Sequence, residues 1–290
     1  ELPLVVIDVQ RAGPSTGLPT KTEQTDLGIA LYGRHGECPV PVLAAATAED
    51  CFYTAYESVR LATKYMTPVL LLSDSFLANS SGAFRIPSAS SLPDLRIEAP
   101  RGAEGFAPYR RDPVTLARPW ATPGMAGMLH RVGGLEGESV TGKVSYDGEN
   151  HQQMVHERAA KIARIADDIP PAAVSGEDAG ELLVIGWGST YGAIAGAVHE
   201  MRLKGRPVSH LHLRYIHPLP RNMDEVLSRF RQVLVPENNL GQLRSLLGSR
   251  FPRGFHGLNK VDCRPFRIRE VTAAIEAILS GRSAEACVSQ

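Results

Sequence analysis

The sequence predicts an α/β protein with two regions of alternating strands and helices. Short apolar runs alternate with segments of helical periodicity in residues 1 to about 75, and the same alternation returns after about residue 180. Between them, from about residue 78 to residue 148, the periodicity fades while proline, glycine and serine accumulate. A chain of 290 residues with 43% hydrophobic and 21% charged residues has enough apolar material for the core of each region.

The first region has the order βαβαβ. Its expected elements are a strand at 4–9, a helix near 21–31, a strand at 40–45, a helix near 48–65 and a strand at 69–74. Thr47 and Asp50 have the spacing of a capping box at the start of the second helix. Apolar residues recur along this helix at helical spacing, namely Phe52, Ala55, Tyr56, Val59 and Ala62. We therefore expect this stripe to belong to the core and not to a cofactor site.

The second region follows a polar helix near 149–166 and a boundary rich in proline and glycine at 169–180. Strands are expected at 182–186, 208–216 and 233–236, helices near 191–204 and 222–231, and two further helices around a possible strand at 261–266. The turn 186–192, Gly-Trp-Gly-Ser-Thr-Tyr-Gly, is close to the dinucleotide-binding pattern, but its third glycine comes one residue late. We therefore predict a tight turn that packs against the sheet.

The composition excludes several classes of function. The formal net charge is zero, so no broad attraction to nucleic acid or to an anionic membrane is expected. No apolar run is long enough for a membrane span, and no segment resembles a signal peptide. The four cysteines are far apart and form no C-x-x-C pair: Cys38, Cys51, Cys263 and Cys287. We expect reduced thiols in a cytoplasmic protein, and no zinc or iron–sulfur site built from this chain alone.

A metal site on the polar helix is also not expected. His151 and His156 are five residues apart, and Glu157 follows directly. An offset of five places the two histidines on different faces of a helix, so a solvated or interfacial helix is the better interpretation.

The loop at 10–20, Gln-Arg-Ala-Gly-Pro-Ser-Thr-Gly-Leu-Pro-Thr, directly follows the first expected strand. Ligands of α/β sheets gather outside the carboxyl ends of the strands. Arg11 could hold an anionic substrate there, because its planar guanidinium offers parallel donors to a carboxylate and stays charged. The alternative is that Arg11 is a solvated or structurally paired residue at the start of a Gly/Pro loop.

The same loop supports a hypothesis from a different class. Residues 13–17, Gly-Pro-Ser-Thr-Gly, match the G-x-S-x-G nucleophile elbow of serine hydrolases, with Ser15 as the nucleophile. Asp74 and either His130 or His151 could complete a triad. The strands that build an oxyanion hole normally precede such a serine, however, and only nine residues precede this loop.

A second polar loop contains Arg34, His35 and Glu37 before a proline. A titratable histidine between opposite charges could transfer protons or gate an active site. A cluster of surface ion pairs is the alternative interpretation.

Four further polar residues lie near expected strand ends. Asp8 and Asp74 could cap helices or orient Arg11. His217 is expected in a turn, and Glu237 could be an interface contact. Neither of the last two has a catalytic argument.

Six segments, taken jointly and in order, resemble the α subunit of the 2-oxoacid:ferredoxin oxidoreductases, and most closely the 2-oxoglutarate type. They are the loop at 10–20, Tyr-Gly-Arg-His-Gly-Glu-Cys-Pro at 32–39, Thr-Pro-Val-Leu-Leu-Leu-Ser-Asp at 67–74, the turn at 186–192, His-Pro-Leu-Pro at 217–220 and Val-Pro-Glu-Asn-Asn-Leu-Gly-Gln-Leu at 235–243. The resemblance covers nearly the whole chain, and each segment alone would be a weak signal.

The resemblance implies an arrangement of domains. Residues 1–100 would complete a thiamine-pyrimidine-type domain whose amino-terminal part is absent, residues 101–179 would form an irregular connector with a helix, and residues 180–290 a transketolase-C-terminal-like α/β domain. The family's α subunit also has an upstream segment with a substrate loop and the glutamate that activates the aminopyrimidine. The sequence is therefore expected to be the carboxyl-terminal portion of a longer α chain, or the second piece of a divided one.

The resemblance also implies a reaction. A 2-oxoacid, expected to be 2-oxoglutarate, would be oxidatively decarboxylated to CO₂ and an acyl-coenzyme A, with electrons passed to ferredoxin. The partner β subunit would carry most of the thiamine diphosphate site, Mg²⁺ and a [4Fe–4S] cluster, in a hetero-oligomer such as (αβ)₂ that is active only when assembled. Arg11 matches the family's substrate-binding arginine, and Ser15 and Thr16 would offer hydroxyls or backbone amides nearby. A non-catalytic scaffold subunit of the same complex is the alternative.

Overall fold

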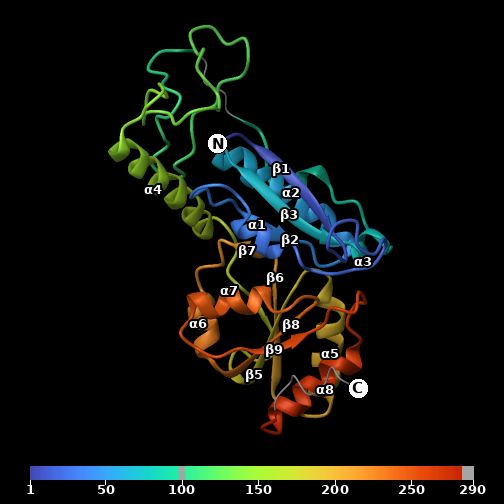
Figure 1. The fold of residues 1–290 in the computed structure, drawn as a ribbon. Helices are drawn as coiled ribbons and strands as arrows, with labels where there is room; N and C mark the ends of the chain where they lie inside the picture. Colours follow the sequence, from blue (N-terminus) through green and yellow to red (C-terminus); the bar gives the residue numbers. More distant parts are fainter. Residues whose placement is uncertain (98–101, 283–290) are drawn as a thin grey trace.

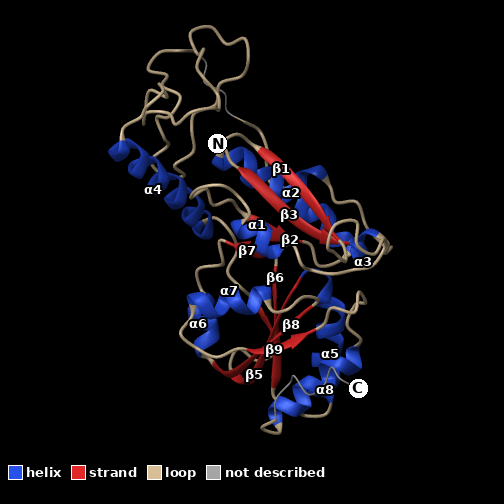
Figure 2. Ribbon diagram, in the orientation of Figure 1, coloured by secondary structure: helices blue, strands red, loops and turns tan. Residues whose placement is uncertain are grey.

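The protein folds into two β-sheets flanked by helices, as the sequence predicts. The computed structural model describes residues 1–97 and 102–282. One sheet has the strand order β1-β3-β2-β7 and the other the order β4-β6-β5-β8-β9. Figures 1 and 2 show one sheet above the other, with the helix α4 and the irregular connector at the upper left. The α/β class is therefore confirmed.

The amino-terminal region builds most of the first sheet. Its parallel strands are β1 (Leu4–Gln10), β3 (Pro68–Asp74) and β2 (Val42–Ala44), with β1 at the edge. The helix α2 (Ala48–Tyr65) packs on this sheet. Thr47 accepts a hydrogen bond from the backbone N–H of Asp50 at 3.1 Å, which is half of the predicted capping box. The Asp50 carboxylate accepts from the backbone one residue before the cap instead of from Thr47.

The carboxyl-terminal region builds the second sheet. Its parallel strands are β6 (Val208–Leu213), β5 (Gly180–Trp187), β8 (Phe230–Glu237) and β9 (His256–Asn259), and the short antiparallel strand β4 (Val174–Ser175) lies at one edge. The helices are α5 (Tyr191–Leu203), α6 (Met223–Ser228), α7 (Gln242–Arg250) and α8 (Ile268–Leu279). Leu182 and Val184 of β5 pack with α5 and α8, whereas Leu183 and Ile185 pack with α6 and α7. This alternation is the expected consequence of a strand covered on both faces.

One of three hydrophobic clusters among the described residues joins the two sheets. Leu27 of α1 (Leu27–Tyr32) and Val42 of β2 belong to the same buried cluster as residues of β5, α6 and α7. The predicted strand at 208–216 is wrong as a single strand, because β7 (Tyr215–His217) leaves the second sheet and pairs antiparallel with β2. Arg214 lies at the break, where its side chain bonds Asp50 and its carbonyl accepts from the backbone of the first sheet at 2.8 Å.

Two further expected elements are wrong. The helix near 21–31 is reduced to α1, because the residues before it are extended and buried, and the backbone N–H of Gln24 donates to the Asn238 carbonyl at 2.9 Å. The strand at 261–266 is irregular, and β9 lies before it instead. In the run 261–266 only Phe266 is buried, so the segment lacks the apolar face that a strand in this sheet requires.

The connector is irregular, as its composition predicts. After the short helix α3 (Ser75–Ala78), the described residues up to 147 contain one short 3₁₀ turn, η1 (Ala89–Ser91), as their only helical element. The helix α4 (Gly148–Arg164) and the turn η2 (Ile165–Asp167) follow. Arg111 donates to the Glu1 carboxylate at 2.7 Å, and Lys161 of α4 does so at 2.5 Å. Although burial raises the pKa of Glu1, these two cations lower it to about 2, so the buried carboxylate stays charged.

Three of the cysteines, Cys38, Cys51 and Cys263, are free thiols, and Cys287 lies outside the described residues. Within the two described ranges, every helix is too short or too polar to cross a bilayer.

Candidate functional site

The loop after β1 is fastened at its base by two buried residues. The Gln10 amide donates to the Ser73 carbonyl at 3.0 Å and accepts from the backbone N–H of Asp26 at 3.1 Å. The backbone N–H of Ala12 donates to the Lys21 carbonyl at 3.0 Å. These bonds hold both ends of the loop against β3 and the start of α1, so the loop is positioned by the first sheet.

The shape of this loop requires a glycine at position 17. Gly17 has a φ of 55°, and a Cβ built there would lie 1.7 Å from the Ala12 carbonyl oxygen. Any side chain would therefore force the loop open. This requirement explains one of the two glycines that made the segment resemble a nucleophile elbow.

Arg11, Ser15 and Thr16 are exposed on the loop. In the described part of the chain, none of these three side chains makes a hydrogen bond or an ion pair. They follow the carboxyl end of β1, which lies beside the carboxyl end of β3. In Figure 1 both arrows end beside α3. This edge is where open α/β sheets bind their ligands. The loop therefore offers one cation and two hydroxyls at the ligand-binding edge of the first sheet.

The two aspartates near the loop, Asp8 and Asp74, do not pair with Arg11 in the described chain. One carboxylate oxygen of Asp74 accepts from the backbone N–H groups of Phe76 and Leu77 at 2.9 and 3.1 Å, so its expected role as a helix cap is confirmed. Burial, with a smaller effect of the Asp26 charge, raises the pKa of Asp8. Neither Asp8 nor Asp74 bonds Arg11 in the described structure.

The structure does not assemble the hydrolase triad. The Asp74 carboxylate is used at the start of α3. His130 lies 3.1 Å from Arg118 and 2.8 Å from the carbonyl of Met128, and His151 lies 2.7 Å from Glu136. Because both nominated histidines are engaged elsewhere, Ser15 has neither of the bases that the hypothesis requires.

The second polar loop lies at the opposite end of the parallel strands from Arg11. Arg34, His35 and Glu37 precede β2, which runs parallel to β1 and β3, so they lie where these strands begin and not where they end. Arg34 donates to the carbonyls of Ala30, Leu31 and Cys38 at 2.7, 2.8 and 3.0 Å, the first two at the end of α1. His35 and Glu37 are exposed. The structure thus separates this loop from Arg11.

A cavity of about 540 Å³ adjoins this second loop. Arg34, Glu37, His217 and Arg250 line it. His217, expected in a turn, is the last residue of β7, and Arg250 donates to its Nδ1 across 3.2 Å. Burial lowers the pKa of His217 to about 4, with further lowering by the two arginines, so its ring is neutral near pH 7.

The polar turns of the second sheet bind the first region instead of a ligand. The Gln24 side chain donates to the Trp187 carbonyl at 2.9 Å and accepts from the backbone N–H of Asn238 at 3.1 Å. Asn239 donates to the Gln24 carbonyl at 2.7 Å, and Gln242 donates to the carbonyl one residue further on at 2.8 Å. The sequence analysis did not predict a function for these residues. The signal that could have identified them is the recurrence of amide side chains directly after an expected strand.

The turn at 186–192 is a tight turn against the sheet, as predicted. Gly188 has a φ of 59°, and a Cβ built there would lie 2.5 Å from the Gln24 amide nitrogen. The absence of a side chain at Gly188 therefore leaves room for the Gln24 amide of the first region, and this contact explains the glycine without a dinucleotide.

Glu237 is fully buried at the end of β8. Its carboxylate accepts hydrogen bonds from the indole of Trp187, the amide of Asn239 and the backbone N–H groups of Leu243 and Arg244, at 3.2, 3.1, 2.7 and 3.0 Å. Burial raises the pKa of Glu237, and these four donors oppose that rise. Glu237 therefore organises the start of α7 inside the protein, which corrects the expectation of an interface contact.

The fold defines the class of the protein, an α/β protein with two sheets whose candidate site is the loop after β1. Residues 1–146 match the family model described as "Pyruvate flavodoxin/ferredoxin oxidoreductase, thiamine diP-bdg", which is half of the chain. The chain belongs to this family. The resemblance seen in the sequence is thus confirmed, together with the thiamine-binding class of the first domain.

Individual relatives agree with this assignment. The chain is 50% identical to the 2-oxoglutarate oxidoreductase subunit KorA of Mycobacterium tuberculosis, over 98% of this chain and 44% of that protein. It is 35% identical to the α subunit of 2-oxoacid:ferredoxin oxidoreductase 1 of Aeropyrum pernix, over 85% of this chain and 39% of that protein.

A solved structure has the same fold. The 2-oxoglutarate:ferredoxin oxidoreductase from Magnetococcus marinus, with 2-oxoglutarate, coenzyme A and succinyl-CoA bound, matches with a TM-score of 0.89 and 31% identity, over 94% of this chain and 48% of that chain. This chain therefore spans less than half the length of these relatives.

Proposed function

We propose that this chain is part of the α subunit of a thiamine-diphosphate-dependent 2-oxoacid:ferredoxin oxidoreductase that acts on 2-oxoglutarate. In this reaction the 2-oxoacid is oxidatively decarboxylated, the acyl group passes to coenzyme A and the electrons pass to ferredoxin. The relatives named for 2-oxoglutarate, one of them 50% identical to this chain, support the substrate. The scaffold alternative remains an outcome of the test below.

Within this function, we propose that Arg11 binds a carboxylate of the substrate. The observation that carries the proposal is an exposed arginine without a partner in the described chain, on a loop fixed at the carboxyl edge of the first sheet. A guanidinium in this state can bind a carboxylate with two parallel hydrogen bonds without first breaking a bond inside the protein. Ser15 and Thr16 lie on the same loop and are proposed as further donors.

The loop with Arg34, His35 and Glu37 stays outside this proposed substrate site. It lies at the beginning of the parallel strands, and Arg34 is used by three backbone carbonyls. Substrate bound at Arg11 would therefore contact none of these three residues. A function of this loop as a gate would have to act through another part of the complex.

The described residues contain no group of three or more His, Cys, Asp or Glu side chains close enough to hold a metal ion. From the family resemblance, we propose that the β subunit holds Mg²⁺, the diphosphate end of thiamine diphosphate and the [4Fe–4S] cluster. The contribution of this chain is to bind and orient the anionic substrate, which brings reactants together in a fixed geometry.

An assembled complex is also supported by the edge of the first sheet. The edge strand β1 exposes apolar side chains, among them Leu4, Ile7 and Val9 with exposed fractions of 56, 57 and 49%. An exposed apolar edge strand usually marks a surface that further protein covers, either another subunit or another part of a longer α chain. We propose a cytoplasmic hetero-oligomer such as (αβ)₂, with residues 1–100 and 180–290 as its two domains in this chain and 101–179 as their connector.

The experiment that tests this function is ferredoxin reduction by the complete complex with 2-oxoglutarate and coenzyme A, comparing wild type with Arg11→Ala. We expect turnover at low substrate to fall about 10- to 100-fold, because a charge-assisted hydrogen bond contributes about 1.5–3 kcal/mol. Arg206→Ala is the matched control, since Arg206 is also exposed but lies before β6 in the second sheet.

Each outcome of this experiment has a separate meaning. Unchanged turnover in the assembled Arg11→Ala complex would leave this chain as a scaffold. Wild type that reduces ferredoxin with another 2-oxoacid but not with 2-oxoglutarate would overturn the substrate. Wild type that uses no 2-oxoacid would overturn the reaction.

A further inference from the structure

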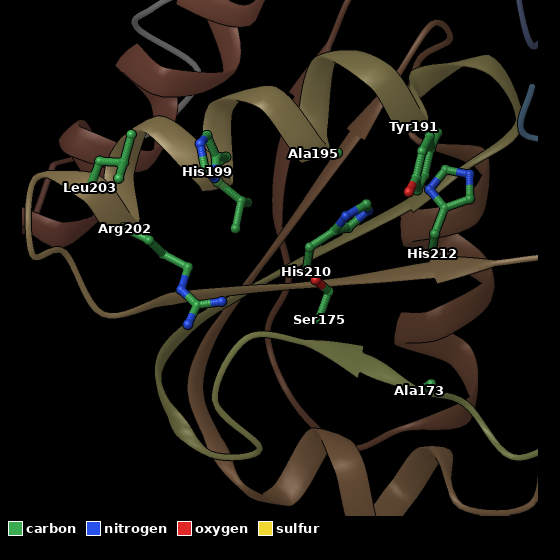
Figure 3. A pocket seen from close by; sticks show the side chains of 10 residues that line it. Ala173, Ser175, Tyr191, Ala195, His199, Arg202, Leu203, His210 and His212 are labelled. Carbon is green, nitrogen blue, oxygen red and sulfur yellow. The ribbon is translucent and has the colours of Figure 1, made fainter.

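A second cavity lies in the carboxyl-terminal region, away from the loop that carries Arg11. It has a volume of about 500 Å³ and lies between α5 and the edge of the second sheet formed by β6 and β4. Figure 3 shows Tyr191 and Arg202 at opposite ends of the cavity, His210 and His212 on the strand below the helix, and Ser175 on the neighbouring strand β4. The size is within the range of small-molecule sites in proteins.

The lining of this cavity can donate hydrogen bonds but carries no acidic side chain. Its polar residues are three histidines, one arginine, one serine and one tyrosine, and the rest are alanine, valine and leucine. In the described chain, the hydroxyls of Ser175 and Tyr191 have no partner. The hydroxyls and the buried Nδ1 of His212 can also accept hydrogen bonds. The guanidinium of Arg202, with no carboxylate in the lining, favours a ligand that carries a negative charge.

His210 provides the strongest indication of a missing partner. It is 4% exposed, and its Nε2 atom is buried without a hydrogen bond. Leaving a buried polar atom without a partner costs about 1–3 kcal/mol, so such atoms in folded proteins call for an explanation. Because Nε2 has almost no accessible surface, an acceptor atom in the cavity reaches it only after a small rotation of the ring. It would then accept a hydrogen bond from Nε2–H and remove this cost.

The histidines are held in place without using this atom. The His212 Nε2 donates to the Gly188 carbonyl at 3.0 Å. The rings of Tyr191, His210 and His212 contact one another, with centroids 5.0–5.7 Å apart. Burial lowers the pKa of His210 to about 4 and of His212 to about 3. Both rings are therefore neutral near pH 7, and His210 can donate from one nitrogen.

Arg202 supplies a positive charge at the other end. The carboxylate paired with it is that of Glu177, at 3.6 Å, and the side chain of Glu177 is 82% exposed. Such a pair is weak in water, so a buried oxyanion would compete with it. Arg202 is eleven residues after Tyr191 on α5, about 16 Å along a helix. The cavity is thus elongated, with a cation at one end and an aromatic ring at the other.

We propose that this cavity binds a small metabolite bearing a phosphate or a carboxylate, whose oxyanion lies between Arg202 and His210. The body of the metabolite then extends along Ala195 towards Tyr191. The site is separate from the proposed substrate site, because every lining residue belongs to the carboxyl-terminal region and Arg11 belongs to the first sheet.

Equilibrium dialysis of the complete native complex tests this proposal, with radiolabelled inorganic phosphate, adenosine monophosphate and succinate as separate probes. We expect saturable binding of at least one probe, weakened about tenfold or more by Arg202→Gln and by His210→Phe, since a hydrogen bond to a charged group contributes about 1.5–3 kcal/mol. Binding of phosphate alone would identify a free anion, binding of the nucleotide a phosphate ester, and binding of succinate a carboxylate. Arg206→Gln, on the loop after α5, is the matched control and should bind as wild type does.

Two further variants keep the result decisive. Ala195→Leu narrows the cavity without touching the donors, and it should weaken the nucleotide more than inorganic phosphate if the body of the metabolite extends along α5. Arg11→Ala should leave unchanged the part of the binding that Arg202→Gln removes, whatever it does to turnover or to succinate bound at the substrate site, so this proposal and the proposed function can fail independently. Absence of saturable binding for all three probes, or binding that survives Arg202→Gln and His210→Phe in folded complexes, would overturn the site.

Discussion

Two loops of this chain follow the carboxyl ends of parallel strands, and they differ in what their polar groups contact. The loop at 11–20 after β1 leaves Arg11, Ser15 and Thr16 exposed, without partners in the described chain. The turn at 237–242 after β8 buries Glu237 and Asn239, and their polar atoms are bonded to this chain. The position that favours ligand binding is the same in both cases. Only the first loop has polar groups left for a ligand, whereas the second uses them to join the two sheets.

The largest expected effect of this difference is on stability. Glu237→Ala removes the acceptor of four hydrogen bonds and leaves buried donors of Trp187 and α7 unpaired. We expect the free energy of unfolding to fall by about 3 kcal/mol or more, because each buried donor left without a partner costs about 1–3 kcal/mol. Urea unfolding followed by circular dichroism measures this loss. Arg11→Ala should change stability by less than about 0.5 kcal/mol, and a comparable loss in both variants would break the comparison.

Acid should lower the stability of the protein through its buried polar residues, of which His210 is the clearest case. The folded pKa of His210, about 4, lies below its ordinary value of 6.5. The stability that the neutral ring contributes is present above pH 6.5 and is lost as pH falls towards 4, because the unfolded state then binds the proton first. His212 has the same sign, with a folded pKa of about 3.

The expected size of the acid effect is roughly 2 kcal/mol for each histidine between pH 7 and pH 5. Free energies of unfolding at these two pH values, for wild type and His210→Phe, measure it. The variant should lose less stability on acidification than wild type. An identical pH dependence would show that His210 is not kept neutral by the fold.

A smaller loss is expected where the first region enters the second. Gln24→Ala removes the side-chain bonds to the Trp187 carbonyl and to the backbone of Asn238, while the backbone bonds of residue 24 remain. We expect a loss of about 2 kcal/mol, measured by the same urea titration. Gln153→Ala on α4 is the control, because Gln153 is exposed. Equal stability of Gln24→Ala and wild type would mean that the buried turn does not hold the two regions together.

The sequence predicted the elements whose local patterns agree with the fold. The helix at 48–65 has a cap, and its bounds in the structure are those expected. The expectation that its apolar stripe is core was wrong, because Phe52 and Val59 are exposed and only Ala62 of the stripe is buried. The buried face of the helix contains Thr54, Ser58, Leu61 and Tyr65 instead.

The prediction of a helix near 21–31 was wrong because the buried Gln24 pairs with a segment more than 200 residues away. Local periodicity contains no information about such a partner. The same holds for β7, whose place in the first sheet depends on Arg214 and Asp50.

For the candidate site, the sequence located the loop but not its surroundings. The position of Arg11 after a strand was enough to place it at the carboxyl end of β1, where we propose that the substrate binds. The separation of Arg34 from Arg11 follows from strand direction, because one loop ends a parallel strand and the other begins one. Sequence spacing alone treats both loops alike. The orphan Nε2 of His210 is likewise invisible in the sequence, since it depends on what the folded chain fails to supply.

The smallest expected effect concerns the backbone of the exposed loop. Ser15 has a φ of 58°, a conformation that glycine adopts more easily than serine. Ser15→Gly should therefore raise stability by about 0.5 kcal/mol, since relief of the left-handed conformation outweighs the entropy that glycine adds to the unfolded chain. Ser88→Gly is the matched control, because Ser88 is also exposed but has a φ of −66°. Glycine there relieves no left-handed conformation, adds the entropic cost and removes one exposed hydrogen bond to Ser90. Melting temperatures of the two variants decide the matter. If both variants lose stability equally, the loop does not hold Ser15 in this conformation, and the rigid presentation of Arg11 that distinguishes it from the buried turn would lose its structural basis.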